Sequence, residues 1–130
     1  IKMQDGDDVT IIATGHLVWE ALEAIKELDK KGISADLLNI HTIKPLDQDS
    51  ILKSVRKTGC VLTAEEHNYW GGLGESVARI LVKNHPVPQE FVATNDTFGE
   101  SGTPSELMNK YKINSNSIIS SVLRLLKKSE

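Results

Sequence analysis

The sequence predicts a three-layer α/β/α fold around a mostly parallel sheet, and two observations support this. Apolar, β-branched runs of strand length, such as residues 9–14, alternate along the chain with segments whose apolar residues recur at helical spacing. Continuous apolar runs are typical of strands covered on both faces, and strands joined through helices lie parallel between two helical layers. The 130 residues are close to the length of one domain, so we expect a single domain over residues 1–130.

The first half of the chain predicts two strand–helix units. After the strand at 9–14, a helix is expected with Glu20, Glu23, Glu27 and Lys30 outward, Gly32 at its C′ position, and an inward stripe of Val18, Ala21, Leu22, Ile25 and Leu28. A second strand follows at 35–40, and Asp47 is the predicted N-cap of a helix with Ile51, Leu52 and Val55 inward. Residues 1–3 are expected to form an antiparallel edge strand, since only the turn Asp5-Gly6-Asp7 separates them from the next strand.

The second half predicts two further strands and three helices. The third strand is expected at 60–64, and after a loop at 65–72 its helix has Leu73, Val77, Ile80 and Leu81 on one stripe, ending before Pro86 and Pro88. A fourth strand at 90–94 and a polar loop at 95–103 follow. Thr103, Pro104 and Glu106 form a capping box that opens a short helix to about residue 111. A last helix is expected from residue 115 or 116, with Ile118, Ile119, Val122, Leu123 and Leu126 inward.

Composition excludes several classes of protein. The net charge is −3 and no long run carries one sign, so we expect no nucleic-acid partner. No apolar stretch is long enough to span a bilayer, so we expect no membrane association. A single cysteine, Cys60, is typical of a reducing compartment, which predicts a cytoplasmic protein. The first residue is Ile1, and the chain is expected to be a fragment of a longer protein.

A glycine-rich turn is the most distinctive local motif. Gly71, Gly72 and Gly74 stand between the third strand and its helix, at the carboxyl end of a strand, where open α/β sheets bind ligands. A dinucleotide fingerprint would need glycine where Val77 stands. Two interpretations stay open: turn geometry in which glycine adopts a positive φ, or an anion held by free N–H groups at the helix N-terminus.

The remaining polar motifs give no catalytic constellation. Extended Glu65 and Glu66 would point to opposite faces, and no metal-binding spacing occurs in the chain, so no metal site is predicted. The loop around Ser101 lacks the second glycine of a nucleophile elbow. Trp70 lies in the glycine-rich loop and is predicted to pack against another domain or subunit. For His67 two interpretations stay open: a functional polar contact at the strand end, or a place in a solvated loop. The candidate anion-binding or interface set is therefore His67, Trp70, Gly71, Gly72 and Gly74, with no catalytic residue.

Four segments, in register, resemble the C-terminal domain of the transketolase family of thiamine diphosphate enzymes. They are DVTIIATGHLVWEAL at 8–22, NIHTIKPLD at 39–47, VLTAEEHNYWGGLGESVA at 61–78 and DTFGESGTPSELMNKYKI at 96–113. The second segment is most similar to split or archaeal-type transketolases. The resemblance implies a sheet of five strands with one antiparallel, which agrees with the expected edge strand.

The resemblance also implies an activity for the parent enzyme. This is transfer of a two-carbon ketol unit between sugar phosphates in carbohydrate metabolism and the pentose phosphate pathway, with thiamine diphosphate and a divalent cation, Mg²⁺, as cofactors. The family's diphosphate–metal motif is absent here, since Asp5-Gly6-Asp7 has no downstream Asn pair. We therefore expect the domain alone to be inactive and to bind neither cofactor. Its expected partners are the pyrimidine- and diphosphate-binding domains, on the same chain or a partner subunit, within a homodimer.

Three alternatives remain. The related third domain of a deoxyxylulose-phosphate synthase or of a 2-oxoacid dehydrogenase decarboxylating component has the same expected fold. A stand-alone module could hold a small anion on the Gly71 to Gly74 turn. A nucleotide-binding oxidoreductase fragment is disfavoured by Val77 and by the plain turn at Gly15.

Overall fold

A five-stranded mixed sheet forms the centre of the protein. The computed structural model describes residues 2–40, 46–66, 72–94 and 103–129. The strand order is β1-β3-β2-β4-β5, and every neighbouring pair is parallel except β1 and β3. The strands are β1 (Lys2–Gln4), β2 (Val9–Ala13), β3 (Ala35–Asn39), β4 (Val61–Glu66) and β5 (Gln89–Thr94). The predicted mixed, mostly parallel sheet with an antiparallel edge strand is confirmed.

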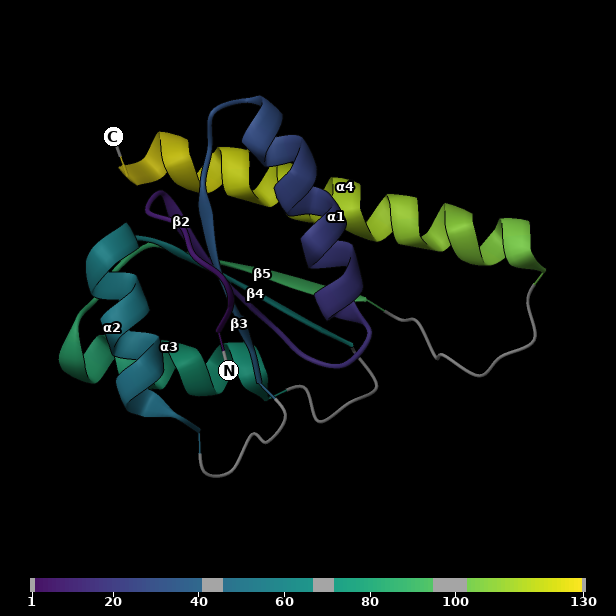
Figure 1. Cartoon of the computed structure of the whole chain (residues 1–130). Helices are drawn as coiled ribbons and strands as arrows, with labels where there is room; N and C mark the ends of the chain where they lie inside the picture. Colours follow the sequence, from purple (N-terminus) through teal and green to yellow (C-terminus); the bar gives the residue numbers. More distant parts are fainter. Residues whose placement is uncertain (1, 41–45, 67–71, 95–102, 130) are drawn as a thin grey trace.

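Helices cover both faces of the sheet, as Figure 1 shows. Helices α1 (Leu17–Lys30) and α4 (Pro104–Ser129) share one hydrophobic core with Ile11, whereas Ile12 faces the core under α2 (Gln48–Thr58) and α3 (Leu73–Asn84). Successive strand residues point to opposite faces, and both side chains are fully buried. This explains why β2 is buried along its whole length and apolar at every position except Thr10, and it confirms the three-layer prediction.

Helix α1 buries the predicted inward stripe, but one residue predicted to face outward is buried as well. Val18, Ala21, Ile25 and Leu28 are buried, and Gly32 follows the helix with a φ of 78°. Glu20, however, was expected among the outward residues and is only 1% exposed. Because α4 packs beside α1, the buried arc of α1 is wider than one sheet-facing stripe, and that arc includes Glu20.

Helix caps bear out the predicted starts of α2 and α4. The Asp47 carboxylate accepts the Ser50 N–H at 3.1 Å, and the Thr103 hydroxyl accepts the Glu106 N–H at 3.2 Å. Gly59 ends α2 in the left-handed region with a φ of 81°.

The edge strand β1 reaches its place because of Gly6. It pairs with β3, not with the neighbouring strand in sequence, so the chain must cross the start of β3. A Cβ on Gly6 would lie 2.2 Å from the Ala35 backbone carbon, and the Gly6 N–H donates to Asp36 Oδ1 at 3.1 Å. Only glycine allows this close approach.

The C-terminal helix differs from the prediction in two respects. A single helix runs over Pro104–Ser129, although the Asn and Ser residues at 114–117 suggested a break. Residues 105–129 contain neither glycine nor proline, and Asn114 is buried, so packing outweighs the modest helix preference of these residues. The inward stripe is Ile118, Val122 and Leu125, while Leu123, expected inward, is 39% exposed.

Candidate functional site

The carboxyl ends of the four parallel strands form the edge where a ligand is expected. After β2, the Thr14 N–H donates to the Ala64 carbonyl at 3.2 Å, which ties this turn to β4. Gly15 turns the chain with a φ of 55°, and the exposed His16 occupies the N-cap position of α1 without a side-chain capping bond. This turn is therefore rigidly placed and presents His16 to solvent.

An internal carboxylate lies at the N-terminus of α3. Glu65 is the fifth residue of β4, and its Oε2 accepts the Leu73 N–H at 2.7 Å. Gly72, the N-cap residue, has no side chain with which to cap α3, and its own carbonyl accepts the Ser76 N–H at 2.8 Å. A negative charge is favourable at this end of a helix, so Glu65 supplies locally what a bound anion would supply.

The two described glycines of the turn are not there for a positive φ. Gly72 has a φ of −115°, and Gly74 lies within the first turn of α3. A Cβ on Gly74 would lie 2.4 Å from a ring carbon of Phe91 and 3.1 Å from Thr63 Oγ1. The Gly74 carbonyl also accepts from Gln89 Nε2 at 3.0 Å. Gly74 is thus required for close packing of α3 on β5, which corrects the positive-φ interpretation at both positions.

The other candidate residues lie outside the described part of the chain. These are His67, Trp70 and Gly71, and the same holds for Ser101 and the segment 41–45. Among the candidate set, the structure places only Gly72 and Gly74, side by side with Glu65. Sequence reasoning missed the role of Glu65, although its position eight residues before Leu73, at the end of a buried strand, was visible.

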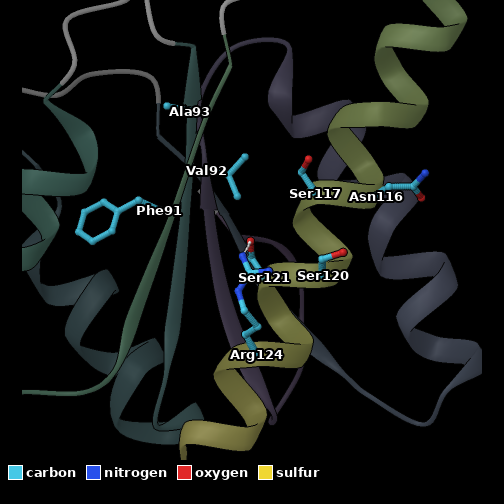
Figure 2. Close-up of a pocket in the computed structure, with 8 residues that line it drawn as sticks. All are labelled: Phe91, Val92, Ala93, Asn116, Ser117, Ser120, Ser121 and Arg124. Carbon is cyan, nitrogen blue, oxygen red and sulfur yellow. Dashed lines mark hydrogen bonds between the residues drawn. The ribbon is translucent and has the colours of Figure 1, made fainter.

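A groove lies between β5 and α4 on the outer side of the sheet. It encloses about 530 Å³ and is lined by Val92 and Ala93 of β5 and by small or polar residues of α4, Asn116, Ser117, Ser120, Ser121 and Arg124. Figure 2 shows Val92 directed toward α4 and the Phe91 ring on the opposite side of β5. Arg124 Nη2 donates to Glu90 Oε1 at 3.2 Å and to Ser121 Oγ at 2.9 Å.

A buried polar cluster occupies the opposite, amino-terminal edge of the strands. Asp36 is fully buried and accepts hydrogen bonds from the Ser54 hydroxyl, the Gly6 N–H and Lys57 Nζ. Burial acts to raise the pKa of Asp36, but these hydrogen bonds and the nearby Lys2 ammonium outweigh it and lower the pKa below its usual value. The cluster joins β3, α2 and the turn after β1, so its position indicates a structural role.

Cys60 has the properties of a core residue. Its thiol donates to the Asp8 carbonyl at 3.4 Å, and burial, with a smaller effect of Asp8, raises the pKa of the thiol. A protonated, buried thiol is a poor nucleophile. Over the described residues, no group of three or more His, Cys, Asp or Glu side chains is placed to hold a metal ion. Within the same ranges, no helix is long and apolar enough to cross a bilayer.

Comparison with known proteins assigns this α/β domain to a family. A family model described as transketolase, C-terminal domain, matches residues 1–118. The 6-deoxy-6-sulfo-D-fructose transketolase subunit of a Clostridium species is 45% identical over 117 residues, covering 90% of this chain and 36% of the relative. A 1-deoxy-D-xylulose-5-phosphate synthase of Geobacter sulfurreducens is 43% identical over 99 residues, covering 69% of this chain and 16% of that enzyme. A solved structure titled "Split gene transketolase, inactive beta4 tetramer" superposes with a TM-score of 0.83 at 39% identity, covering 100% of this chain and 43% of that chain.

The chain belongs to the transketolase C-terminal domain family. It spans 36% of the length of the Clostridium transketolase subunit and 43% of the split-gene transketolase chain. The resemblance drawn from the four sequence segments is therefore confirmed at the level of the family.

Proposed function

We propose that residues 1–130 form the C-terminal domain of a longer transketolase-type enzyme, which transfers a two-carbon ketol unit between sugar phosphates. The observation that carries this proposal is the match over the whole chain, at a TM-score of 0.83 and 39% identity, to a split transketolase subunit. We further propose that the enzyme is a cytoplasmic homodimer acting in pentose phosphate metabolism.

We place the cofactors of the parent enzyme outside the described residues of this domain. In the family, thiamine diphosphate stabilises the carbanion formed from the donor sugar, and a divalent cation such as Mg²⁺ holds its diphosphate. The only sequence likeness to a diphosphate–metal motif here is Asp5-Gly6-Asp7. Two of these residues make hydrogen bonds to β3 or to the residue before it. The Gly6 N–H donates to Asp36, and the Asp7 N–H donates to Ser34 Oγ at 2.9 Å. These residues do not fit the cofactor, and we assign it to the preceding domains or a partner subunit.

Within the enzyme, we propose that the domain serves as a structural and interface element. The Glu65 carboxylate at the start of α3 supports this, because it accepts the Leu73 N–H that an external anion would need. The turn at 71–74 is then better suited to holding the following helix in place than to binding phosphate. In this view His67 and Trp70 contact a neighbouring domain or subunit.

A substrate panel on the complete enzyme tests the proposed activity. We expect turnover with xylulose 5-phosphate as donor and ribose 5-phosphate as acceptor, measured by coupled aldehyde release. Because one relative is named for 6-deoxy-6-sulfo-D-fructose, that donor belongs in the panel. Activity with either ketose donor supports ketol transfer, whereas activity restricted to pyruvate as donor contradicts it.

A second candidate is the third domain of a deoxyxylulose-phosphate synthase. The Geobacter relative at 43% identity favours it, although the matched region covers 69% of this chain, against 90% for the transketolase subunit. Carbon dioxide release from pyruvate with glyceraldehyde 3-phosphate as acceptor distinguishes the two enzymes.

The interface role is tested by Trp70→Ala in the complete enzyme. We expect the variant to dissociate at protein concentrations at which the unchanged enzyme stays assembled. An aromatic residue that anchors an interface can contribute about 2 kcal/mol or more to association. Trp19→Ala is the matched control, since Trp19 is the other tryptophan and is 67% exposed on α1. Unchanged dissociation of the Trp70→Ala enzyme would remove Trp70 from the interface.

The anion-binding alternative is tested on the 130-residue chain by calorimetric titration with inorganic phosphate. The internal Glu65 contact predicts no heat of binding at micromolar phosphate. A micromolar dissociation constant that is lost in Gly72→Pro would support the stand-alone module in place of the structural role.

A further inference from the structure

The two edges of the sheet are protected to very different degrees. Strand β1 has three residues, includes Lys2, and has an irregular register against β3. Short length, lysine and irregular pairing are the devices that keep an edge strand from pairing with another chain. Strand β5 has six residues in regular register with β4 and contains neither lysine nor proline. No strand in the described part of the chain pairs with its outer side.

The register identifies the backbone groups on this open edge. The Val61 N–H donates to the Pro88 carbonyl at 3.1 Å, and Val61 is paired with Gln89. In a parallel pair, alternate residues of each strand point their N–H and C=O groups toward the neighbour. Gln89, Phe91 and Ala93 therefore direct these groups away from β4. Phe91 is 56% exposed and Ala93 is also exposed.

The surroundings of the edge leave room for a further strand. Along one side runs the groove of about 530 Å³, where α4 presents Asn116, Ser117 and Ser120, all small or medium polar side chains. Figure 2 shows these three residues on α4, on the side of β5 toward which Val92 points. The only charged residues at the groove, Glu90 and Arg124 among those described, neutralise each other in an ion pair.

We propose that the outer edge of β5 pairs with β5 of a second copy of this chain, antiparallel and about a two-fold axis at Phe91. Under this symmetry Phe91 lies opposite Phe91 of the partner, and Gln89 lies opposite Ala93. All three are residues whose N–H and C=O groups point outward, so each exchanges backbone hydrogen bonds across the axis. The two half-exposed Phe91 rings become a cross-strand aromatic pair, and the result is one sheet continuous through both copies.

A second copy is the occupant that these features favour. The edge is self-complementary about Phe91, and the neighbouring Glu90–Arg124 pair gives the surface no net charge that would repel its own image. The structurally similar split subunit is described as a tetramer of one kind of subunit. The inference rests on the proposed function in one respect only, namely that copies of this subunit associate.

Amide hydrogen exchange of the 130-residue chain at two protein concentrations tests the pairing directly. We expect the Phe91 and Ala93 amides to be protected at high concentration and to exchange freely on dilution, while the Val92 amide, bonded within the sheet, is protected at both. Free exchange of the Phe91 and Ala93 amides at every concentration would overturn the proposal. The exchange pattern does not depend on activity, so failure here leaves the proposed ketol transfer standing, and failure of that assay leaves this pairing standing.

Substitutions at Ala93 provide the second arm, read by sedimentation equilibrium. Ala93→Pro removes an outward N–H that β4 does not use, and Ala93→Ser is its control. The proline should raise the dissociation constant about thirtyfold, because two-fold symmetry removes one ordinary hydrogen bond from each copy. Ala93→Lys places charges at the edge without altering the backbone and should have an effect at least as large, with Trp19→Lys on α1 as its control. Association that is unchanged in both Ala93→Pro and Ala93→Lys would place the interface elsewhere.

Discussion

The buried carboxylate of Asp36 should be among the largest single polar contributions to the stability of this domain. The substitution Asp36→Asn keeps the shape of the side chain and removes its charge. Its partners are the Ser54 hydroxyl, the Gly6 N–H and Lys57 Nζ, the last at 3.1 Å, with Lys2 Nζ at 3.4 Å. With asparagine at this fully buried position, the ammonium groups of Lys2 and Lys57 face a neutral side chain.

The magnitude follows from the geometry. Hydrogen bonds to a charged group exceed neutral ones by about 1 kcal/mol each, so the Ser54 and Gly6 bonds together lose about 2 kcal/mol. The lysine side chains are 36% and 37% exposed, so solvent screens their pairs with Asp36, which add little to this loss. We expect Asp36→Asn to lower the free energy of unfolding by about 2–3 kcal/mol.

Urea denaturation at neutral pH measures this change, with Asp47→Asn as the matched control. Asp47 is an exposed N-cap, and asparagine caps a helix about as well as aspartate, so the control should change stability by less than about 0.5 kcal/mol. A loss below about 0.5 kcal/mol for Asp36→Asn would refute the reasoning, because the cluster would then contribute no more than a surface contact.

The pH dependence of the free energy of unfolding is an independent test of the role of Asp36. The folded-state pKa of Asp36 lies below the usual value, so its contribution is fully present above the unfolded pKa of about 3.9 and is lost as the pH falls through the folded pKa. Stability of the Asp36→Asn protein should therefore fall less steeply than that of the wild type in this acid range. Parallel acid profiles would contradict the assignment.

Three further outcomes are expected. Gly74→Ala should lower the free energy of unfolding by about 1 kcal/mol, because the new Cβ would lie 2.4 Å from the Phe91 ring. In a Phe91→Ala background the same change should be stabilising, and equal effects in both backgrounds would contradict the packing role. Asp47→Ala should lower the free energy of unfolding by about 1 kcal/mol through loss of the N-cap, and a neutral effect in urea denaturation would contradict it. Cys60, with its raised pKa, should react with a thiol reagent only upon unfolding, and rapid labelling of the native protein at neutral pH would disprove its burial.

Much of the fold follows from local sequence because local chemistry and burial agree there. The apolar run of β2 is buried on both faces, and Asp47 and Thr103 accept the N–H bonds expected of N-caps. Gly32 and Gly59 end their helices at positive φ. In each case the signal lies within a few residues of its effect.

The differences arise where distant elements meet. Glu20 is buried because α4 lies beside α1, and α4 continues past Asn114 because packing supports it. Gly74 is explained chiefly by Phe91, which is 17 positions further along the sequence. These effects depend on long-range contacts, which no local pattern encodes.

The glycine-rich turn follows the predicted third strand, but the contact that Glu65 makes with the start of α3 was not predicted. A glycine-rich turn before a helix suggests an anion in general terms. Here Glu65, the fifth residue of β4, accepts the Leu73 N–H with its side chain, a contact between residues eight positions apart. The open edge of β5 was equally invisible, since strand order is a property of the topology.

The most direct measurement is isotope transfer by the complete enzyme. Xylulose 5-phosphate labelled with ¹³C at its first two carbons is incubated with unlabelled ribose 5-phosphate, and the products are followed by NMR. The account predicts that both labelled carbons appear together as the first two carbons of a new ketose phosphate. A new ketose phosphate without the label, from an enzyme that in a parallel incubation releases carbon dioxide from pyruvate, would contradict it.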